Sequence, residues 1–122
     1  MNDLQVIKHK NERVLLTSQL AEVYETDVKN IQMNFKRNEN RFIEGRDYYL
    51  LKGDELKEFK NLPTVSGLVD PRTPSLHLWT ERGANRHSKI LDTDQAWKQF
   101  DVLEETYFKV KDTGYQIPST PM

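Results

Sequence analysis

The chain has 122 residues, a length typical of one domain, and a formal net charge of −1. It contains no cysteine, which excludes disulfides and thiolate metal sites and favours a reducing compartment. No segment approaches the roughly 20 apolar residues that a membrane span needs, and the first ten residues lack the apolar core of a signal peptide. We therefore expect a cytoplasmic protein with no membrane partner.

Charge is distributed unevenly along the chain. Residues 29–46 include five basic and two acidic side chains, whereas residues 101–112 include two basic and four acidic ones. One face of the molecule can therefore be basic although the whole is nearly neutral. Ordinary patchiness of surface charge would also explain this pattern.

A short β-hairpin is predicted first. Val6 and Ile7 open one apolar segment, residues 14–16 form a second, and residues 10–12 supply a turn between them. A helix follows, with Thr17 or Ser18 as its N-terminal cap.

Two short helices are predicted between residues 17 and 38. In the first, Leu20, Val23 and Tyr24 share one face. Asp27 caps the second, in which three apolar side chains point inward. These are Val28, Ile31 and Phe35. Because only one or two residues separate the helices, they must cross at a steep angle.

The spacing within this pair is typical of a helix-turn-helix. Ala21 provides the small residue where the two helices approach, and Ile31 lies ten positions further on, where a buried aliphatic is needed. Glu25 occupies the turn position that glycine often fills, because the backbone there favours a positive φ. This departure suggests a different turn or a winged variant.

The outer face of the second helix is the candidate recognition surface, because residues 28–38 contain no acidic residue. Lysine and arginine can neutralise phosphates or bind guanine, and asparagine and glutamine can pair with adenine. A basic, merely solvated helix is the alternative. The candidate DNA-binding residues are Lys29, Asn30, Gln32, Met33, Asn34, Lys36, Arg37 and Arg41.

The rest of the chain predicts a strand at residues 48–51, a short helix carrying Leu56 and Phe59, and a long, flexible loop at residues 61–75. A second strand at residues 76–79 follows. We therefore expect an α+β fold.

Two helices complete the predicted fold. Thr80 caps one helix that ends near Ile90, and a long final helix runs from about residue 93 to residue 110. The final helix has an apolar stripe made of Trp97, Phe100, Leu103, Tyr107 and Phe108. The side chains expected in the core are Leu20, Ile31, Phe35, Trp79, Trp97 and Phe100.

A second basic surface is a weaker candidate. Arg82, Arg86, His87 and Lys89 are all expected near the exposed side of their helix. Arg86 and Lys89 could contact phosphate or a partner, whereas the arginines could instead pair with nearby acids and hold helices together.

Enzymatic chemistry is not expected. The three histidines lack metal-ligand spacing, so we expect no metal, and no cofactor motif is present. No serine has the sequence context of a nucleophile elbow.

Two long segments resemble a known family. The segments RVLLTSQLAEVYETDVKNIQMNFKRNENRFIEGRDYYLLKGDELKEF and LWTERGANRHSKIL, the latter continuing as DTDQAWKQFDVLEETYF, are similar to the phage ORF-six-N domain. That domain belongs with the KilA-N and Bro-N group of viral DNA-binding domains. The resemblance implies an α+β DNA-binding domain at the front of a phage or prophage regulator such as an antirepressor, working in a bacterial host.

The resemblance also sets the expected domain organisation. Residues 1–112 are the KilA-N-like domain, and residues 113–122 are a linker or flexible tail toward a C-terminal domain that this sequence does not include.

Two function classes remain open. One is a transcription regulator that binds double-stranded DNA with helix 28–38 in the major groove. The other is a protein-interaction module that binds a phage repressor. A homodimer is a further candidate assembly.

Overall fold

Four short antiparallel strands form one sheet in the order β1-β2-β4-β3. The computed structural model describes residues 4–110. The strands are β1 (Ile7–His9), β2 (Glu12–Leu16), β3 (Tyr48–Lys52) and β4 (Ser75–Trp79). Five α-helices accompany the sheet in this part of the chain, which confirms the predicted α+β class. They are α1 (Thr17–Val23), α2 (Val28–Arg37), α3 (Gly53–Lys60), α4 (Glu81–Leu91) and α5 (Asp94–Leu103).

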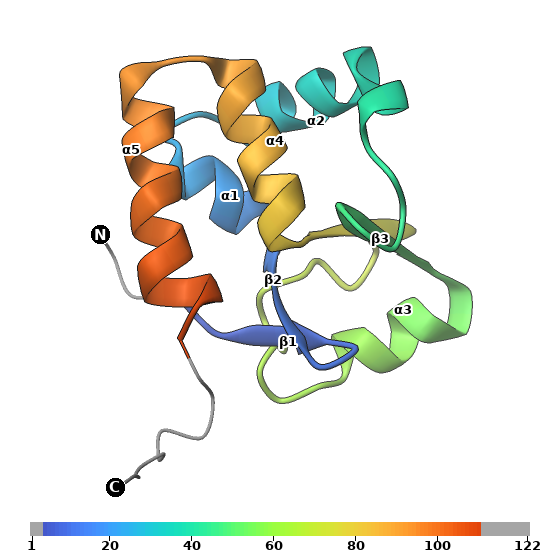
Figure 1. Cartoon of the computed structure of the whole chain (residues 1–122). Coiled ribbons are helices and arrows are strands. Elements are labelled where there is room, and N and C mark those ends of the chain that lie inside the picture. The colour runs from blue at the N-terminus through green and yellow to red at the C-terminus, as the bar shows by residue number, and fades with distance from the viewer. Residues whose placement is uncertain (1–3, 111–122) are drawn as a thin grey trace, which may run out of the picture.

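The helices lie in two groups. In Figure 1, α1, α2, α4 and α5 lie above the strands, whereas α3 lies at the lower right beside β3. Each group covers its own hydrophobic cluster, because side chains alternate between the two faces of a strand. In β2, Leu15 joins the cluster under the four helices, whereas Val14 and Leu16 join the cluster under α3.

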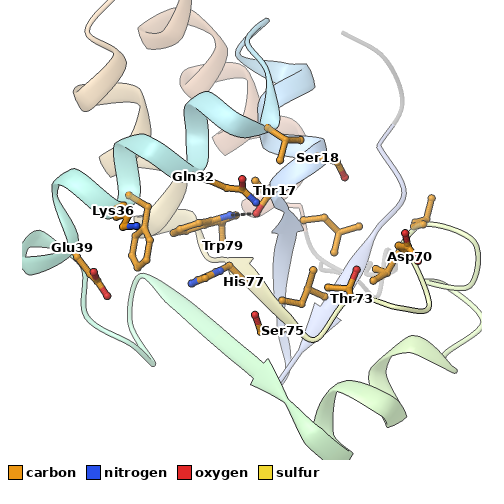
Figure 2. A pocket seen from close by; sticks show the side chains of 16 residues that line it. Thr17, Ser18, Gln32, Lys36, Glu39, Asp70, Thr73, Ser75, His77 and Trp79 are labelled. Atoms are coloured by element: carbon orange, nitrogen blue, oxygen red, sulfur yellow. Dashed lines mark hydrogen bonds between the residues drawn. The ribbon is translucent and has the colours of Figure 1, made fainter.

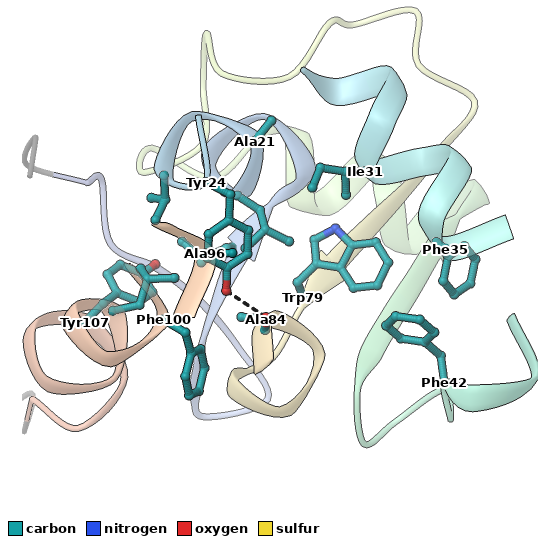
Figure 3. Packing of buried hydrophobic residues seen from close by; sticks show 14 residues of the cluster. Ala21, Tyr24, Ile31, Phe35, Phe42, Trp79, Ala84, Ala96, Phe100 and Tyr107 are labelled. Carbon is teal, nitrogen blue, oxygen red and sulfur yellow. Dashed lines mark hydrogen bonds between the residues drawn. The ribbon is translucent and has the colours of Figure 1, made fainter. Parts of the chain in front are cut away.

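The larger cluster is centred on Trp79. Figure 3 shows its indole beside Ile31 and Phe35 of α2, with Phe42 nearby. The Tyr24 hydroxyl donates to the carbonyl oxygen of Ala84 at 2.7 Å, which links the end of α1 to α4 (Figure 3). These contacts bury one side of α2 and leave the other side exposed.

Several predicted helix starts are confirmed, whereas the cap of α1 and the hairpin turn differ from prediction. Asp27 and Thr80 cap α2 and α4 through their side chains, as predicted, and Thr93 caps α5. The hydroxyl cap predicted for α1 is wrong, because the backbone N–H of Leu16 donates instead to the Gln19 side chain at 2.9 Å. The hairpin turn is also one residue shorter than predicted, since Glu12 already pairs with His9 in the sheet.

The connections around α2 and α3 also differ from prediction. Four residues, 24–27, separate α1 from α2 rather than one or two. Glu25 adopts φ +55°, the conformation that glycine takes at such a turn, so no different turn is needed to accommodate it. The long loop at residues 61–75 is anchored to the fold, because Val65 is buried and Lys60 donates to two loop carbonyls.

The predicted final helix is interrupted. α5 ends at Leu103 and continues as a wider π-helical turn, Glu104–Phe108. This turn brings the Tyr107 hydroxyl between β1 and β2, where it accepts from the Ile7 N–H at 3.0 Å and donates to the Val14 carbonyl at 2.7 Å. The predicted tail at residues 113–122 lies outside the described residues.

Two predicted core positions are wrong. Trp97 is 50% exposed, because Ala96, Phe100 and Leu103 take the inward face of α5 and Trp97 is one residue out of phase with them. Val28 is 39% exposed because it lies at the start of α2, at the edge of a groove.

Candidate nucleic-acid interface

The candidate surface is the solvent face of α2. Ile31 and Phe35, four residues apart, are buried and fix the rotation of the helix. The side chains on the opposite face are therefore exposed. They are Lys29, Met33, Lys36 and Arg37, flanked by Asn30 and Gln32.

The N-terminal end of α2 is held by local hydrogen bonds. Asp27 Oδ1 accepts from the Asn30 backbone N–H at 2.7 Å. The Asn30 side-chain amide donates to Thr26 Oγ1 at 2.8 Å. Asn30 is thus exposed, as predicted, but one of its donors is engaged. Asn34 is half-buried and lies nearer the side of α2 that faces the fold.

A groove of about 690 Å³ runs along one side of α2. In Figure 2, Trp79 and His77 lie between Lys36 and Glu39 on the α2 side and Thr73 and Asp70 on the opposite side. Trp79 is held there by its indole N–H, which donates to Thr17 Oγ1 at 2.9 Å. His77 stacks parallel to Trp79, with ring centroids 5.5 Å apart.

A smaller hollow of about 390 Å³ lies beside the C-terminal end of α2. Asn38, Arg41, Arg86, Lys89 and Ile90 line it. Arg41 belongs to the 3-10 turn after α2, whereas the other two cations come from α4, which packs against α2. The structure thus brings Arg41 together with the two residues predicted to form a separate second basic surface. We refer to this site as the basic hollow.

A buried carboxylate stands behind the basic hollow. Asp47 is fully buried, accepts from Arg46 Nη2 at 2.9 Å, and faces Arg86 Nε at 3.3 Å. Burial by itself would raise the pKa of Asp47. The hydrogen bonds from Arg46 and from the Ile43 N–H, together with the charge of Arg86, outweigh burial and hold that pKa below its ordinary value of 3.8.

In α4, the exposure of the predicted basic residues is only partly as expected. Arg82 and Lys89 are exposed and Arg86 is half-buried. His87, predicted near the exposed side, is instead fully buried against Trp79 and Phe42. Arg46 and Asp47 were not predicted as site residues. Asp47 pairs with Arg86, which lies some forty residues further along the chain, and so distant a pair leaves no periodic pattern in the sequence.

Two features are absent from residues 4–110. No group of three or more histidine, aspartate or glutamate side chains there could hold a metal ion. None of the helices in that range has the length and apolarity needed to cross a membrane.

Fold and surface together define a small α+β domain that presents one acid-free helix between two hollows. The chain belongs to the ORF6N domain family, which matches residues 4–90. This membership makes it a phage-type regulatory domain. The match covers the sheet and α1 to α4. The similarity expected for residues 92–108 lies beyond it. Comparisons with curated proteins and with solved structures gave no match.

Proposed function

We propose that the chain is a sequence-specific DNA-binding domain of a phage or prophage regulator of the antirepressor type, rather than an enzyme. The observation that carries this proposal is the exposed face of α2, which combines cations and amides and contains no acid. A helix of this kind fits the major groove of double-stranded DNA. α1 and α2 then act as a helix-turn-helix, since Ala21 of α1 is buried and α1 packs against α2.

Different residues of α2 would have different roles. Lys29, Lys36 and Arg37 would bind phosphates or guanine edges and so set affinity. Gln32 and the side-chain oxygen of Asn30 would read bases. Met33, which is 38% exposed at the centre of the face, offers an apolar contact of the kind that thymine methyl groups accept.

One helix reaches only one half-site, so we propose that tight binding uses a homodimer. A lone domain should bind weakly and with a strong salt dependence.

A fluorescence-anisotropy titration against a labelled duplex at two salt concentrations tests this proposal. Lys36→Ala and Arg37→Ala should each weaken binding. Lys98→Ala is the matched control, because it removes an exposed lysine from α5, which α4 separates from α2 (Figure 1). Equal binding by all four proteins would contradict the proposal.

A second candidate function rests on the larger groove. Val28 and Leu68, both at its edge, are exposed apolar side chains, and the net charge of the chain is nearly zero. These features suit a protein partner such as a phage repressor. Saturable binding of a repressor, with no binding of DNA even at low salt, would favour this function over the first.

A further inference from the structure

The basic hollow has a single sign of charge. It is lined by Arg41, Arg86 and Lys89 together with the amide side chain of Asn38, and none of its described lining residues is acidic. Glu39 lies in the larger groove, on the other side of α2. Asp47 compensates Arg86 from behind the hollow, whereas no acidic residue faces Arg41 and Lys89 among the described lining residues, so the hollow attracts an anion.

The cations are positioned from two independent elements. Arg41 lies four residues after the end of α2. Arg86 and Lys89 are three residues apart on α4, a spacing that places both on one face of the helix. Because α2 packs against α4, the hollow lies directly beside the C-terminal end of α2.

Asp47 holds Arg86 in place. Its ion pair engages Arg86 Nε, and within residues 4–110 no other side chain forms an ion pair with the guanidinium, so its two terminal nitrogens can face a ligand. The loop that carries Asp47 is itself locked onto α4, because Thr80 Oγ1 donates to the Arg46 carbonyl at 2.7 Å and the Thr80 N–H donates to the Asp47 carbonyl at 3.2 Å. A preordered arginine loses less conformational entropy when it binds an anion.

We propose that the basic hollow binds a backbone phosphate of the DNA strand that flanks the groove occupied by α2. This inference rests on the proposed function and adds a second contact, made by α4, to the one made by α2. Contacts of this type fix the register of a protein on the duplex without reading bases. Asp47 is a positioning residue in this arrangement, since it reaches the phosphate only through Arg86.

The test is the salt dependence of binding to a random-sequence duplex, measured for Arg41→Ala, Lys89→Ala and Lys89→Arg. Each phosphate contact contributes about 0.9 to the slope of log K against log salt. Arg41→Ala and Lys89→Ala should each lower the slope by about 1 and weaken binding on the order of five- to tenfold at about 0.1 M salt. Lys89→Arg should retain most of the affinity. The ion-pair partners of Asp47 in residues 4–110 are Arg46 and Arg86, so variants at Arg41 and Lys89 leave the buried ion pair intact.

The outcomes separate this inference from the proposed function. If Lys36→Ala weakens binding but Arg41→Ala and Lys89→Ala behave like Lys98→Ala, the hollow does not bind phosphate and the assignment of α2 stands. If Arg41→Ala and Lys89→Ala weaken binding, the double variant Lys36→Ala, Lys89→Ala is informative. If its loss of affinity equals the product of the two single-variant losses, both surfaces contact the same duplex. If the wild-type chain binds no duplex at low salt, both proposals fail.

Discussion

His87 is a buried histidine with no polar partner in residues 4–110, and this makes the stability of the domain depend on pH. Its ring lies edge-on to Trp79, with ring centroids 4.4 Å apart, and neither ring nitrogen has a hydrogen-bond partner among the described residues. Burial, assisted by the nearby His77, lowers the pKa of His87 to about 3. In the unfolded chain the pKa returns to its ordinary value of 6.5.

The sign of the effect follows from these two values. Below pH 6.5 the unfolded chain binds a proton that the folded chain excludes, so the free energy of unfolding falls as pH drops from about 6.5 toward about 3. From pH 6.5 to pH 5 the loss is about 2 kcal/mol, since each pH unit corresponds to about 1.4 kcal/mol. The variant His87→Leu places a side chain of similar size there that cannot bind a proton, and so removes this loss.

The assay is urea unfolding followed by tryptophan fluorescence, for wild type and His87→Leu at pH 7.5 and pH 5. The difference in unfolding free energy between the two proteins should shift by about 2 kcal/mol in favour of His87→Leu at the lower pH. His77→Leu is the control, with a smaller expected shift because the His77 ring is only half-buried. A difference that is the same at both pH values would refute this reasoning.

Three substitutions test the packing, each followed by urea unfolding. Ile31→Ala should cost roughly 2–5 kcal/mol, the usual range for a buried aliphatic, and an unchanged midpoint would contradict the buried position of α2. Trp97→Gln should change stability by less than about 0.5 kcal/mol, because this side chain is half-exposed, and a large loss would show that it is covered. Gly83→Ala should destabilise the domain by about 1–3 kcal/mol or more, because a Cβ there would overlap the Asp47 carbonyl. Wild-type stability of this variant would disprove the close approach.

Local patterns predicted much of the fold. The spacing of Ile31 and Phe35 identified the inner face of α2, and the side-chain caps Asp27 and Thr80 marked two helix starts. These features depend on residues close together in sequence, so a single chain contains the information needed to find them.

The errors arose where distant segments decide the outcome. Trp97 is one residue out of phase with Ala96, and only the packing of α5 on α4 shows which of the two lies inward. Thr17 was expected to cap a helix, but its hydroxyl is engaged by the Trp79 indole, which lies 62 residues further along the chain.

The candidate site was predicted only in part, because distant segments of the chain also form part of it. The exposed cations of α2 follow from helical spacing alone. The basic hollow does not, because Arg41 and Arg86 meet only through the packing of α2 on α4 and the buried Asp47. His87 was placed on the exposed side by its polarity, although the helix turns it into the core.

The affinity of the wild-type chain for a random duplex, measured between about 50 and 200 mM salt, tests the DNA-binding proposal most directly. If α2 and the basic hollow together make about five phosphate contacts, affinity should fall on the order of 500-fold over this range. Affinity that does not change with salt, or no binding at the lower concentration, would contradict a DNA-binding role for this domain.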